Sequence, residues 1–531
     1  MTEPQPGAPG TGGAVAPSAD VSRREPGRVD RDRSDPVRVD IGEVAQALDR
    51  AGLLVERRGS LPEWATSLAA DTRQLAPGAL FVAVRGAERD GHAYLADAEG
   101  RGAIAAIVED PEATALPALV VREGRRAAAI AAAAAHGYPA RQLRLVGVTG
   151  TNGKTTTVGM LRHLLDVPAH PAASIGTLGV RVGSAGEELP GGGGLTTPGP
   201  VELQRLFRAL VDAGVRTVAM EVSSHALAQH RVEGVAFDAV LFTNFTRDHL
   251  DYHGSMEAYF AAKARLLEHL APAGVAVVNA DDPAWSALAA RGRVVSFAAA
   301  GGDATVAMRD VVHEPRGSRA RLVVEGAVAP VRVPLLGDFN VANAAAAAAG
   351  AWALGMTIDA IAARLATLPQ VPGRLEVLHE RPVVLRDYAH TPDALARALA
   401  AVRPFTAGRL VVVFGCGGDR DRGKRPEMGR IAESAADVVV LTSDNPRTED
   451  PERILDDIER GMQRREHRRI EDRRAAIAEA LALAGPDDVV LLAGKGHETY
   501  QLRGSESLPF DERAIVAELT GADPAPTRGR A

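Results

Sequence analysis

The segment Leu143–Met160 contains the residues whose types and spacing most clearly predict chemistry. A short apolar run leads into a loop with Gly150 and Gly153, which ends in Lys154 and Thr155 where a helix is expected to begin. A side-chain-poor backbone can bring several N–H groups around a triphosphate, and the helix start adds the positive end of its dipole. The lysine would reach the outer phosphates and the threonine hydroxyl a magnesium ion. We therefore predict a nucleotide phosphate site.

The predicted loop is a shorter variant of the usual phosphate loop, G-x-x-x-x-G-K-[ST]. Position 148 is valine, and the first loop glycine is Gly150. A Gly/Thr-rich turn could also be a simple connection between a strand and a helix. The Lys-Thr pair at the start of the predicted helix favours the phosphate site over a simple connection.

Length and composition are typical of a soluble multidomain enzyme. A chain of 531 residues suggests roughly three domains. The net charge of -7, with acids and bases interspersed, favours neither a nucleic-acid nor a membrane partner. Cys416 is the only cysteine, which excludes an intrachain disulfide, and no stretch is long and apolar enough to span a bilayer. We expect a cytoplasmic protein that is a monomer.

The first part of the chain divides into a tail and a small α/β unit. Residues 1–37 are rich in Pro, Gly, Asp and Arg and lack apolar periodicity, so we predict a disordered tail. In residues 38–140, the Ala-rich stretch Ala127–Ala135 is predicted to be a helix, because alanine is the best helix former. The further elements predicted there are a helix over Val39–Leu54 and strands over Ala79–Val84, Ile104–Val108 and Ala118–Val121.

Residues 141–372 are predicted to form a doubly wound α/β domain, because apolar strands alternate with helices. The expected central strands are Leu145–Val148, Thr217–Met220, Val240–Thr243 and Val275–Val278. A polar motif follows each of them, starting at Gly150, Glu221, Asn244 and Asn279. Ligands of open α/β sheets bind at the carboxyl ends of the strands, so these motifs are expected to converge on one cleft.

Residues 373–531 are predicted to form a second, Rossmann-like α/β domain. Its expected strands are Val383–Leu385, Leu410–Phe414, Val438–Leu441 and Val489–Leu492, with helices over Pro392–Val402 and Pro426–Ala435. Polar motifs again follow the strands, starting at Asp387, Gly415, Ser443 and Gly494. The polar motifs at the strand ends of both domains indicate a bi-substrate enzyme, in which the central domain binds phosphates and the last domain presents another reactant.

Glu221 and His249 are the first candidates for a metal site. A carboxylate and an imidazole at the ends of neighbouring strands could complete a magnesium shell beside the phosphates. Glu221 could equally be a solvated acid at a strand end, and His249 a hydrogen-bonded loop histidine. The residues alone do not decide between these roles.

Lys263 lies at an unusual position for a lysine. In the helix predicted over Met256–Leu270, an apolar stripe runs through positions 256, 259, 260, 266, 267 and 270, and position 263 is at its centre. An inward ammonium is costly unless it is paired, neutralised or reaches the surface along its alkyl chain. We favour a functional lysine over a lysine that reaches the surface.

An ordered set of motifs resembles the Mur ligase family. The motifs are GTNGKTT, EVSSHAL, DHLDYH, GDFNVAN, PGRLE, DYAHTP, GCGGDRDRGKRP, DNPR and GKGHE, spread over about residues 60 to 512. Within the family, the set is most similar to the branch that adds meso-diaminopimelate to UDP-N-acetylmuramoyl-L-alanyl-D-glutamate. The resemblance implies a cytoplasmic step of peptidoglycan synthesis.

The reaction that the resemblance implies proceeds through an acyl phosphate. ATP phosphorylates the γ-carboxylate of the D-glutamate on the UDP-muramoyl dipeptide. The amine of diaminopimelate then attacks the acyl phosphate, which gives a tripeptide, ADP and phosphate. A carboxylate is a poor electrophile until its oxygen becomes a leaving group, and phosphoryl transfer depends on positioning and cations.

The resemblance also implies a role for individual residues. ATP would contact Gly150, Thr151, Asn152, Gly153, Lys154, Thr155, Thr156 and Arg374 at its phosphates, Asn340 and Asn343 at adenine, and Asp387 at the ribose. Magnesium would be held by Thr155, Glu221, His249 and Lys263, the last carbamylated to N6-carboxylysine, which turns an inward cation into a carboxylate-like ligand. Lys154, Lys263, Glu221 and His249 would be the catalytic residues.

The remaining implied contacts are to the UDP substrate and to the amino acid. The UDP-sugar dipeptide would contact Thr72, Arg73, Thr196, Thr197, Ser223, Gln229 and Arg231. Position 72 is commonly serine in relatives, and the run Gly191–Gly194 suggests a mobile loop near this pocket. Diaminopimelate would contact Arg420, Asp444, Asn445, Pro446, Arg447, Gly494 and Glu498.

Arg447 is the residue on which the choice of amino acid depends. Diaminopimelate differs from lysine by one carboxylate, and an arginine can bind a carboxylate with two charge-assisted hydrogen bonds. This argues against the branch that adds L-lysine, unless Arg447 is merely a surface arginine after a turn.

Two competing functions are a folylpolyglutamate synthase-like ligase, which would lack DNPR and the N-terminal UDP-binding unit, and a nucleotide-dependent regulatory protein. A purely structural role would leave the polar strand ends unexplained.

Overall fold

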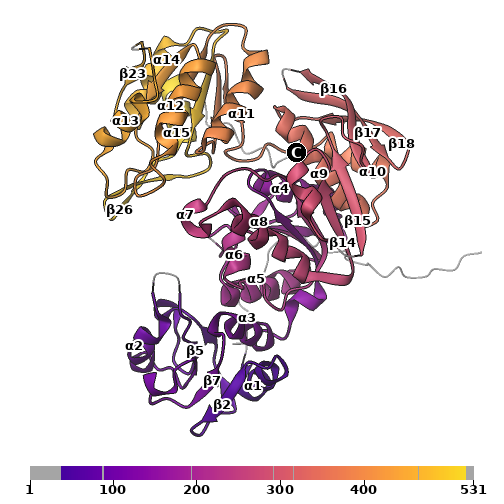
Figure 1. Cartoon of the computed structure of the whole chain (residues 1–531), viewed down its shortest axis with the longest axis vertical. Coiled ribbons are helices and arrows are strands. Elements are labelled where there is room, and N and C mark those ends of the chain that lie inside the picture. Colours follow the sequence, from indigo (N-terminus) through magenta and orange to yellow (C-terminus); the bar gives the residue numbers. More distant parts are fainter. Residues whose placement is uncertain are drawn as a thin grey trace, which may run out of the picture. The chain divides into compact units, whose positions relative to one another are not determined.

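The computed structural model describes residues 38–86, 89–192, 194–290, 292–314, 316–464 and 466–521. The predicted tail over residues 1–37 and Gly193 of the glycine run lie outside the described residues. Three large sheets organise the described part of the chain, and each is covered by helices (Figure 1). The predicted α/β class and three-domain architecture are confirmed, while the boundaries at residues 140 and 372 stay a prediction.

The N-terminal sheet has five strands. Their order is β2 (Leu54–Arg58), β7 (Ala118–Val121), β6 (Ala105–Val108), β5 (Leu80–Val82) and β4 (Leu68–Ala69), and all neighbours are parallel except β2 and β7. The accompanying elements are β1 (Val39–Asp40), β3 (Trp64–Ala65), α1 (Ile41–Arg50), α2 (Leu95–Gly100), α3 (Gly124–Ala135) and the 3-10 turn Thr72–Gln74. The predicted Ala-rich helix is confirmed as α3, whose alanines are buried.

The helix predicted over Val39–Leu54 is shorter in the structure. Asp40 caps α1 by accepting a hydrogen bond from the backbone N of Glu43 at 2.9 Å, which fixes its start. Gly52 has a φ of 68° just after the helix, and Leu54 already begins β2. Apolar spacing detected the helix, whereas its two ends depend on the cap and on the turn.

The central sheet has eleven strands, and its middle is parallel. The order is β11 (Glu187–Leu189), β10 (Gly179–Val182), β9 (Ala172–Gly176), β12 (Thr217–Glu221), β8 (Arg144–Thr149), β13 (Phe237–Phe242), β14 (Leu270–Asn279), β15 (Arg293–Ala298), β16 (Val306–Glu314), β17 (Gly317–Val324) and β18 (Ala327–Val333). Strands β9 to β16 run parallel, and antiparallel strands extend both edges. The four predicted central strands are confirmed as β12, β8, β13 and β14.

Alternate residues of the central strands face two helical layers. On β8, Val146 and Val148 belong to one apolar cluster, whereas Leu145 belongs to the other. One layer contains α4 (Lys154–Leu165), α9 (Asp338–Ala353) and α10 (Ile358–Leu365), and the other contains α5 (Pro200–Asp212), α6 (Ser224–Ala228) and α8 (Met256–Ala264). A short helix, α7 (Leu250–His253), follows β13.

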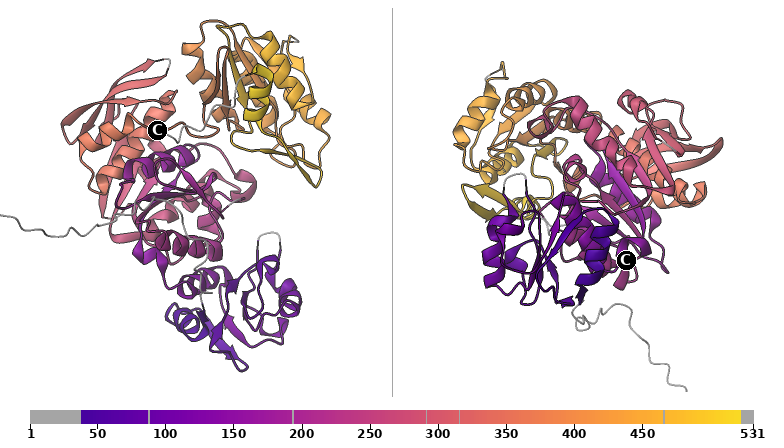
Figure 2. Two further views of the ribbon diagram at one scale, coloured as in Figure 1. Left: turned by 180° about the vertical axis from the view of Figure 1, so that it is seen from behind. Right: turned by 60° about the horizontal axis from the view of Figure 1, so that its bottom comes forward.

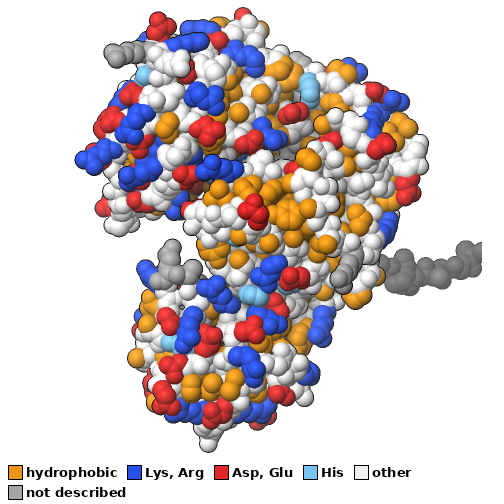
Figure 3. Space-filling model, viewed as in Figure 1, with side chains coloured by type: hydrophobic (Ala, Val, Ile, Leu, Met, Phe, Trp, Pro, Cys, Tyr) orange, Lys and Arg blue, Asp and Glu red, His pale blue; other side chains and the backbone are white. Residues whose placement is uncertain are grey.

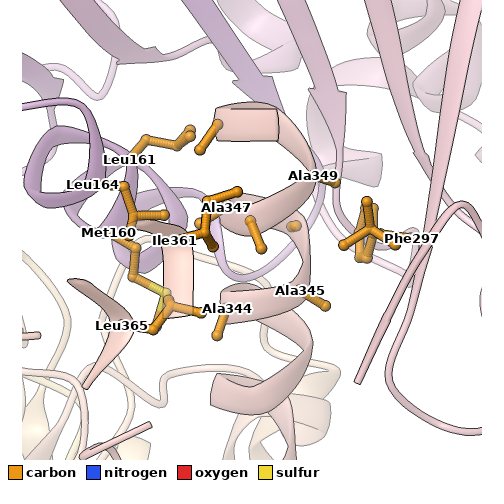
Figure 4. Packing of buried hydrophobic residues seen from close by; sticks show 14 of the residues in the cluster. Met160, Leu161, Leu164, Phe297, Ala344, Ala345, Ala347, Ala349, Ile361 and Leu365 are labelled. Carbon is orange, nitrogen blue, oxygen red and sulfur yellow. The ribbon is translucent and has the colours of Figure 1, made fainter. Parts of the chain in front are cut away.

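The first layer is packed through small side chains. Figure 4 shows Ala344 and Ala347 of α9 close to Met160 of α4 and Ile361 of α10, with Ala349 nearer Phe297 of β15. Residues 344–349 are all alanine and are fully buried, so α9 can approach its neighbours closely. This packing fixes α4, the helix that begins at the predicted phosphate loop.

The C-terminal sheet has six strands with helices on both faces (Figure 2). Its order is β19 (Glu376–Glu380), β20 (Val383–Asp387), β24 (Val489–Ala493), β21 (Leu410–Phe414), β22 (Val438–Leu441) and β23 (Arg468–Arg469), of which only β19 is antiparallel to its neighbour. One face packs α11 (Pro392–Val402), α12 (Lys424–Ala435) and α13 (Pro451–Glu459), and the other packs α14 (Arg473–Leu483) and α15 (Glu512–Thr520). A hairpin, β25 (Tyr500–Arg503) and β26 (Glu506–Pro509), lies between β24 and α15.

The surface agrees with the composition. Figure 3 shows acidic and basic side chains interspersed over the visible face. Among the described residues, no helix is long and apolar enough to cross a membrane.

Candidate functional site

The loop after β8 requires glycine at both positions that the sequence singled out. Gly150 has a φ of 148° and Gly153 a φ of 84°, in the region that favours glycine. A Cβ on Gly150 would lie 1.9 Å from Oγ1 of Thr243, and one on Gly153 would lie 2.3 Å from Oδ1 of Asn343. The loop is therefore tightly enclosed by β13 and α9 as well as bent.

The end of β13 holds this loop in place. The backbone N of Asn152 donates to Oδ1 of Asn244 at 2.8 Å, and Nδ2 of Asn244 donates to the carbonyl of Asn152 at 2.9 Å. Thr243 donates to the same carbonyl at 2.7 Å. The sequence marked Asn244 only as the start of a polar motif, and its position directly after a central strand was the available signal for this role.

Lys154 and Lys263 converge on one carbonyl group. Nζ of Lys154 donates to the carbonyl of Gly150 at 2.9 Å, and Nζ of Lys263 donates to the same carbonyl at 2.7 Å. Lys263 is 1% exposed and lies 4.4 Å from the centre of the Tyr259 ring. Its predicted inward orientation is confirmed, although α8 ends at Ala264 and a 3-10 segment leads to β14, so the helix is shorter than expected.

Burial lowers the pKa of both lysines. For Lys263 the pKa falls well below its ordinary value, mainly through loss of hydration and also through the charge of Lys154. The pKa of Lys154 is also lowered by burial, which the carboxylates of Glu221 and Asp248 partly oppose. The site therefore disfavours the charged ammonium form at both positions.

Glu221 is a buried carboxylate beside the phosphate loop. It ends β12, is 1% exposed, and accepts hydrogen bonds from Oγ1 of Thr155 at 3.0 Å and from the backbone N of Thr177 at 2.8 Å. The alternative of a solvated strand-end acid is therefore wrong. Thr177, in the turn after β9, was missed by the sequence analysis, because nothing in the local pattern shows that it faces Glu221.

Glu221 is also connected to the segment that contains Thr196 and Thr197. The Thr197 hydroxyl donates to the backbone carbonyl of Glu221 at 2.9 Å. The Thr177 hydroxyl donates to Thr196 at 3.3 Å and is also 3.3 Å from Oε2 of Glu221. Glu221 is thus linked to this segment through both its backbone carbonyl and its carboxylate.

His249 lies at the start of α7 with a φ of 52°. Its backbone N donates to Oδ1 of Asp248 at 2.8 Å, and its Nε2 lies 3.4 Å from Oδ2 of the same residue. Its ring is 4.7 Å from that of His225. Partial burial lowers the pKa of His249 in spite of the nearby Asp248, so the imidazole is neutral near pH 7 and can act as a ligand.

The oxygen donors present suit a magnesium ion. Among the described residues, no group of three or more His, Cys, Asp and Glu side chains is arranged to hold a metal. Mg²⁺ usually needs one or two protein carboxylates, with phosphates and waters supplying the rest. Thr155 and Glu221 offer such oxygens 3.0 Å apart. Lys263 would be a ligand only as a carbamate, because an ammonium carries no free electron pair.

A cavity of about 290 Å³ brings many of the predicted residues together. The predicted residues that line it are Thr151, Asn152, Gly153, Lys154, Thr155, Thr156, Thr196, Glu221, His249, Asn343, Arg374 and Asp387. Nη2 of Arg374 donates to Thr155 at 3.2 Å, and burial raises the pKa of Asp387 to about 6. Asn340 does not line this cavity, because its amide donates to the carbonyl of Leu336 at 2.7 Å.

The residues predicted for the UDP substrate form a linked chain in the central domain. The backbone N of Ser223 donates to the Thr197 hydroxyl at 3.0 Å, and Arg231 donates to the Thr197 carbonyl at 2.8 Å and to Gln229 at 2.7 Å. In the N-terminal domain, Thr72 is buried. Arg73 is exposed beside it and pairs with Asp71 at 2.6 Å.

The residues predicted for the amino acid lie at the carboxyl ends of β21, β22 and β24. Nη1 of Arg447 donates to the carbonyl of Gly418 at 2.8 Å, and its backbone φ is 52°. Nδ2 of Asn445 donates to Glu498 at 2.9 Å. A Cβ on Gly494 would lie 2.9 Å from Oδ2 of Asp444, so the glycine permits this close approach. Arg420 is exposed beside Asp419.

Lys495 is a buried residue of this cluster that the sequence analysis missed. It is 0% exposed, and its Nζ donates to Asn445 at 3.0 Å and to Glu498 at 3.1 Å. Asp444 lies 3.6 Å away. Its place inside the GKGHE motif was the only signal, because the sequence does not show that Asn445 and Asp444 approach it from the end of β22.

Comparisons with known proteins agree with this arrangement. Three family models match, namely "Mur ligase family, catalytic domain" over residues 65–145, "Mur ligase middle domain" over 148–351 and "Mur ligase, glutamate ligase domain" over 373–496. The UDP-N-acetylmuramoyl-L-alanyl-D-glutamate–2,6-diaminopimelate ligase of Alkalilimnicola ehrlichii is 47% identical, covering 86% of this chain and 95% of the relative. The enzyme of the same name from Gloeobacter violaceus is 45% identical, covering 85% and 93%.

A solved structure of a protein with that name is similar along most of its length. It is 33% identical, with a TM-score of 0.61, and the match covers 88% of this chain and 97% of that structure. The family models together span most of the described residues, and the relatives match over nearly their full length. The chain belongs to the Mur ligase family.

Proposed function

We propose that the protein is an ATP-dependent ligase that adds meso-diaminopimelate to UDP-N-acetylmuramoyl-L-alanyl-D-glutamate through an acyl phosphate. The observation that carries the proposal is the convergence of Lys154 and Lys263 on the carbonyl of Gly150, next to the Thr155–Glu221 contact. The names of the similar ligases support the identity of both substrates.

The phosphate loop would position ATP for transfer of its γ-phosphoryl group. Backbone N–H groups at the start of α4 and the ammonium of Lys154 would contact the phosphates, and Arg374 would approach them from the segment before β19. Asn343 lies beside Gly153 and would contact the nucleotide, with Asp387 at the ribose. We retain Asn340 as a residue that orients Asn343, to which it is hydrogen-bonded at 3.2 Å.

The metal site would consist of Thr155, Glu221, His249 and carbamylated Lys263. Magnesium, when bound, would neutralise the charge that develops on the transferring phosphoryl group. Hydrogen bonds from Thr155 and Thr177 would hold the carboxylate of Glu221 in place. A carbamate on Lys263 would replace a buried cation by an anion, which removes the repulsion between the ammonium groups of Lys154 and Lys263.

The UDP-sugar dipeptide would bind to Thr72, Arg73, Thr196, Thr197, Ser223, Gln229 and Arg231. In the central domain these residues lie close to Glu221, because Thr197 donates to its backbone carbonyl. The γ-carboxylate of the dipeptide would therefore reach the phosphoryl group near the carboxylate that holds the metal.

The amino-acid site would contain Arg420, Asp444, Asn445, Pro446, Arg447, Gly494 and Glu498. Burial and, to a smaller extent, the charge of Arg420 lower the pKa of Arg447, while Asp444, Glu498 and Asp419 oppose this shift. An arginine can bind a carboxylate with two charge-assisted hydrogen bonds, and diaminopimelate has one more carboxylate than lysine. Glu498 would accept the substrate ammonium.

One assay tests this function. ADP formation is measured with the UDP-muramoyl dipeptide and a panel that includes meso-diaminopimelate and L-lysine. We expect ADP only when both the dipeptide and an amino acid are present, with meso-diaminopimelate preferred. Preference for lysine would assign the lysine-adding branch, and activity with a folate substrate a folylpolyglutamate synthase. Phosphate release without either substrate would favour a regulatory nucleotide hydrolase.

We further propose that the protein acts in the cytoplasm, where ATP and the UDP-linked precursor are available. A monomer is expected, and sedimentation equilibrium would measure it.

A further inference from the structure

Arg425 of α12 is a fully buried arginine below the amino-acid site. It is 0% exposed, and its Nη2 and Nη1 donate to the two carboxylate oxygens of Glu449 at 2.8 and 3.1 Å. Nη1 also donates to Asp457 of α13 at 2.8 Å. We name Arg425, Glu449 and Asp457 the buried clasp. Two parallel hydrogen bonds between a guanidinium and a carboxylate fix both groups in direction as well as distance.

The buried clasp holds the two loops that end β21 and β22. Nη2 of Arg425 donates to the carbonyl of Gly417 at 3.2 Å, in the loop after β21. Glu449, in the loop after β22, accepts a hydrogen bond from the backbone N of Asp419 at 2.5 Å. Thr448 donates to the carboxylate of Asp419 at 2.9 Å. Each loop is therefore attached to the other through the clasp and its neighbours.

These contacts extend to the guanidinium of Arg447. The backbone N of Gly418 donates to the carbonyl of Asn445 at 2.9 Å, and the carbonyl of Gly418 accepts from Nη1 of Arg447 at 2.8 Å. A Cβ on Gly418 would lie 1.8 Å from the carbonyl oxygen of Pro446, so the loops touch without room for a side chain. The position of Gly418 thus determines where Arg447 is held, and the clasp determines the position of Gly418 from both sides.

We propose that Arg425 and Glu449 are positioning residues that set the selectivity for the amino-acid substrate. They do so by holding the loops 417–419 and 445–449 so that Arg447 can meet the distal carboxylate. This inference rests on the proposed function, since it concerns the residues assigned to the amino-acid site. Neither Arg425 nor Glu449 needs to touch the substrate. If Glu449 is neutralised, Arg425 keeps only Asp457 as a charged partner, and the loops lose the contact that joins them through Glu449.

Glu449→Gln tests the positioning role, because it keeps the shape of the side chain and removes its charge. The matched control is Asp488→Asn. Asp488 is 7% exposed and pairs with Arg409 at 2.8 Å, but it lies at the start of β24, at the opposite end of the strands from the amino-acid site. Arg425→Lys is a second variant, since an ammonium keeps the charge but not the planar fork.

Three readouts separate positioning from general destabilisation. We expect Glu449→Gln and Arg425→Lys to raise the KM for meso-diaminopimelate on the order of tenfold and to reduce its preference over lysine, with the KM for ATP unchanged. Asp488→Asn should lower the unfolding midpoint about as much as Glu449→Gln does, without changing the KM for meso-diaminopimelate or for ATP. Hydrogen exchange should become faster at the amides of Gly418 and Asp419 in Glu449→Gln, and not in Asp488→Asn.

The outcomes also distinguish this inference from the proposed function. Wild-type protein that forms ADP with no amino acid would refute the function, while hydrogen exchange would still report on the clasp. If exchange at Gly418 and Asp419 is the same in Glu449→Gln as in wild type, the clasp does not hold the loops. If the wild type is active and Glu449→Gln behaves like Asp488→Asn in both KM values, the positioning role is refuted.

Discussion

Gly176 is a position at which a single added methyl group should strongly reduce the rate of catalysis. A Cβ there would lie 2.2 Å from Oε1 of Glu221 and 2.7 Å from both its Cδ and Cγ. Ordinary contact needs about 3.5 Å, so the carboxylate would have to move by roughly 1 Å. Because Glu221 is held by Thr155 and Thr177, that movement breaks hydrogen bonds of 3.0 and 2.8 Å.

The expected effect of Gly176→Ala is larger on catalysis than on stability. A displacement of about 1 Å in a catalytic group costs on the order of 100-fold in rate. Overpacking of this kind costs about 1–3 kcal/mol, which lowers the unfolding midpoint by several degrees in a domain of this size. We therefore expect a kcat on the order of 100-fold lower, a requirement for more magnesium, and a protein that is still folded.

The assay is ADP formation over a magnesium titration, with circular dichroism to follow unfolding. Gly159→Ala is the control, because Gly159 lies within α4 and a Cβ there would meet nothing within 4 Å. That exchange should leave kcat unchanged and add about 0.5–1 kcal/mol of stability. A folded Gly176→Ala protein with kcat within about twofold of wild type would refute the assignment of Glu221 to the metal site.

Further predictions concern three more residues. Lys263→Met should lower kcat by about 100-fold or more, and intact mass spectrometry of wild type in bicarbonate should show the mass of one added CO₂; unmodified, fully active protein would contradict the carbamate. Arg447→Ala removes charge-assisted hydrogen bonds worth about 1.5–3 kcal/mol, so the preference for diaminopimelate over lysine should fall roughly 10- to 150-fold in kcat/KM; an equal loss for both amino acids would show that Arg447 does not discriminate. Burial and the charges of Arg205 and Arg208 lower the pKa of His136 to about 4. Since the unfolded state takes up this proton near pH 6.5, stability is lost as the pH falls from 6.5 to 4, by at most on the order of 1–3 kcal/mol, and His136→Phe should flatten the pH dependence of the unfolding midpoint.

The sequence predicted those features that depend on local pattern. The loop around Gly150, the central strands and the inward Lys263 follow from glycine spacing, apolar runs and helical periodicity. Element ends were less accurate, because Asp40 and Gly52 delimit α1 through a cap and a turn. The strands β16 to β18, which pair antiparallel with one another, were not predicted, since they alternate buried and exposed residues instead of forming the continuous apolar runs of the parallel core.

Buried polar pairs were the part of the site that the sequence could not show. Thr177, Lys495 and Arg425 each contact partners far away in the chain. A polar residue in a motif is interpreted as a ligand-binding residue until its hydrogen-bond partner within the chain is known. Glu221 is a different case, because the sequence left open whether it is a metal ligand or a solvated strand-end acid, and its burial excludes the solvated acid.

The hydrogen bonds from Thr197 to the Glu221 carbonyl and from Thr177 to Thr196 connect the segment at 196 and 197 to the buried carboxylate beside the phosphate loop. A molecule that displaces the segment at 196 and 197 must also change how firmly the carboxylate is anchored. Under the proposed function, we expect by reciprocity that nucleotide binding and binding of the UDP-linked dipeptide change each other's affinity by the same factor. A molecule bound under this segment should therefore alter nucleotide affinity without contacting the phosphates.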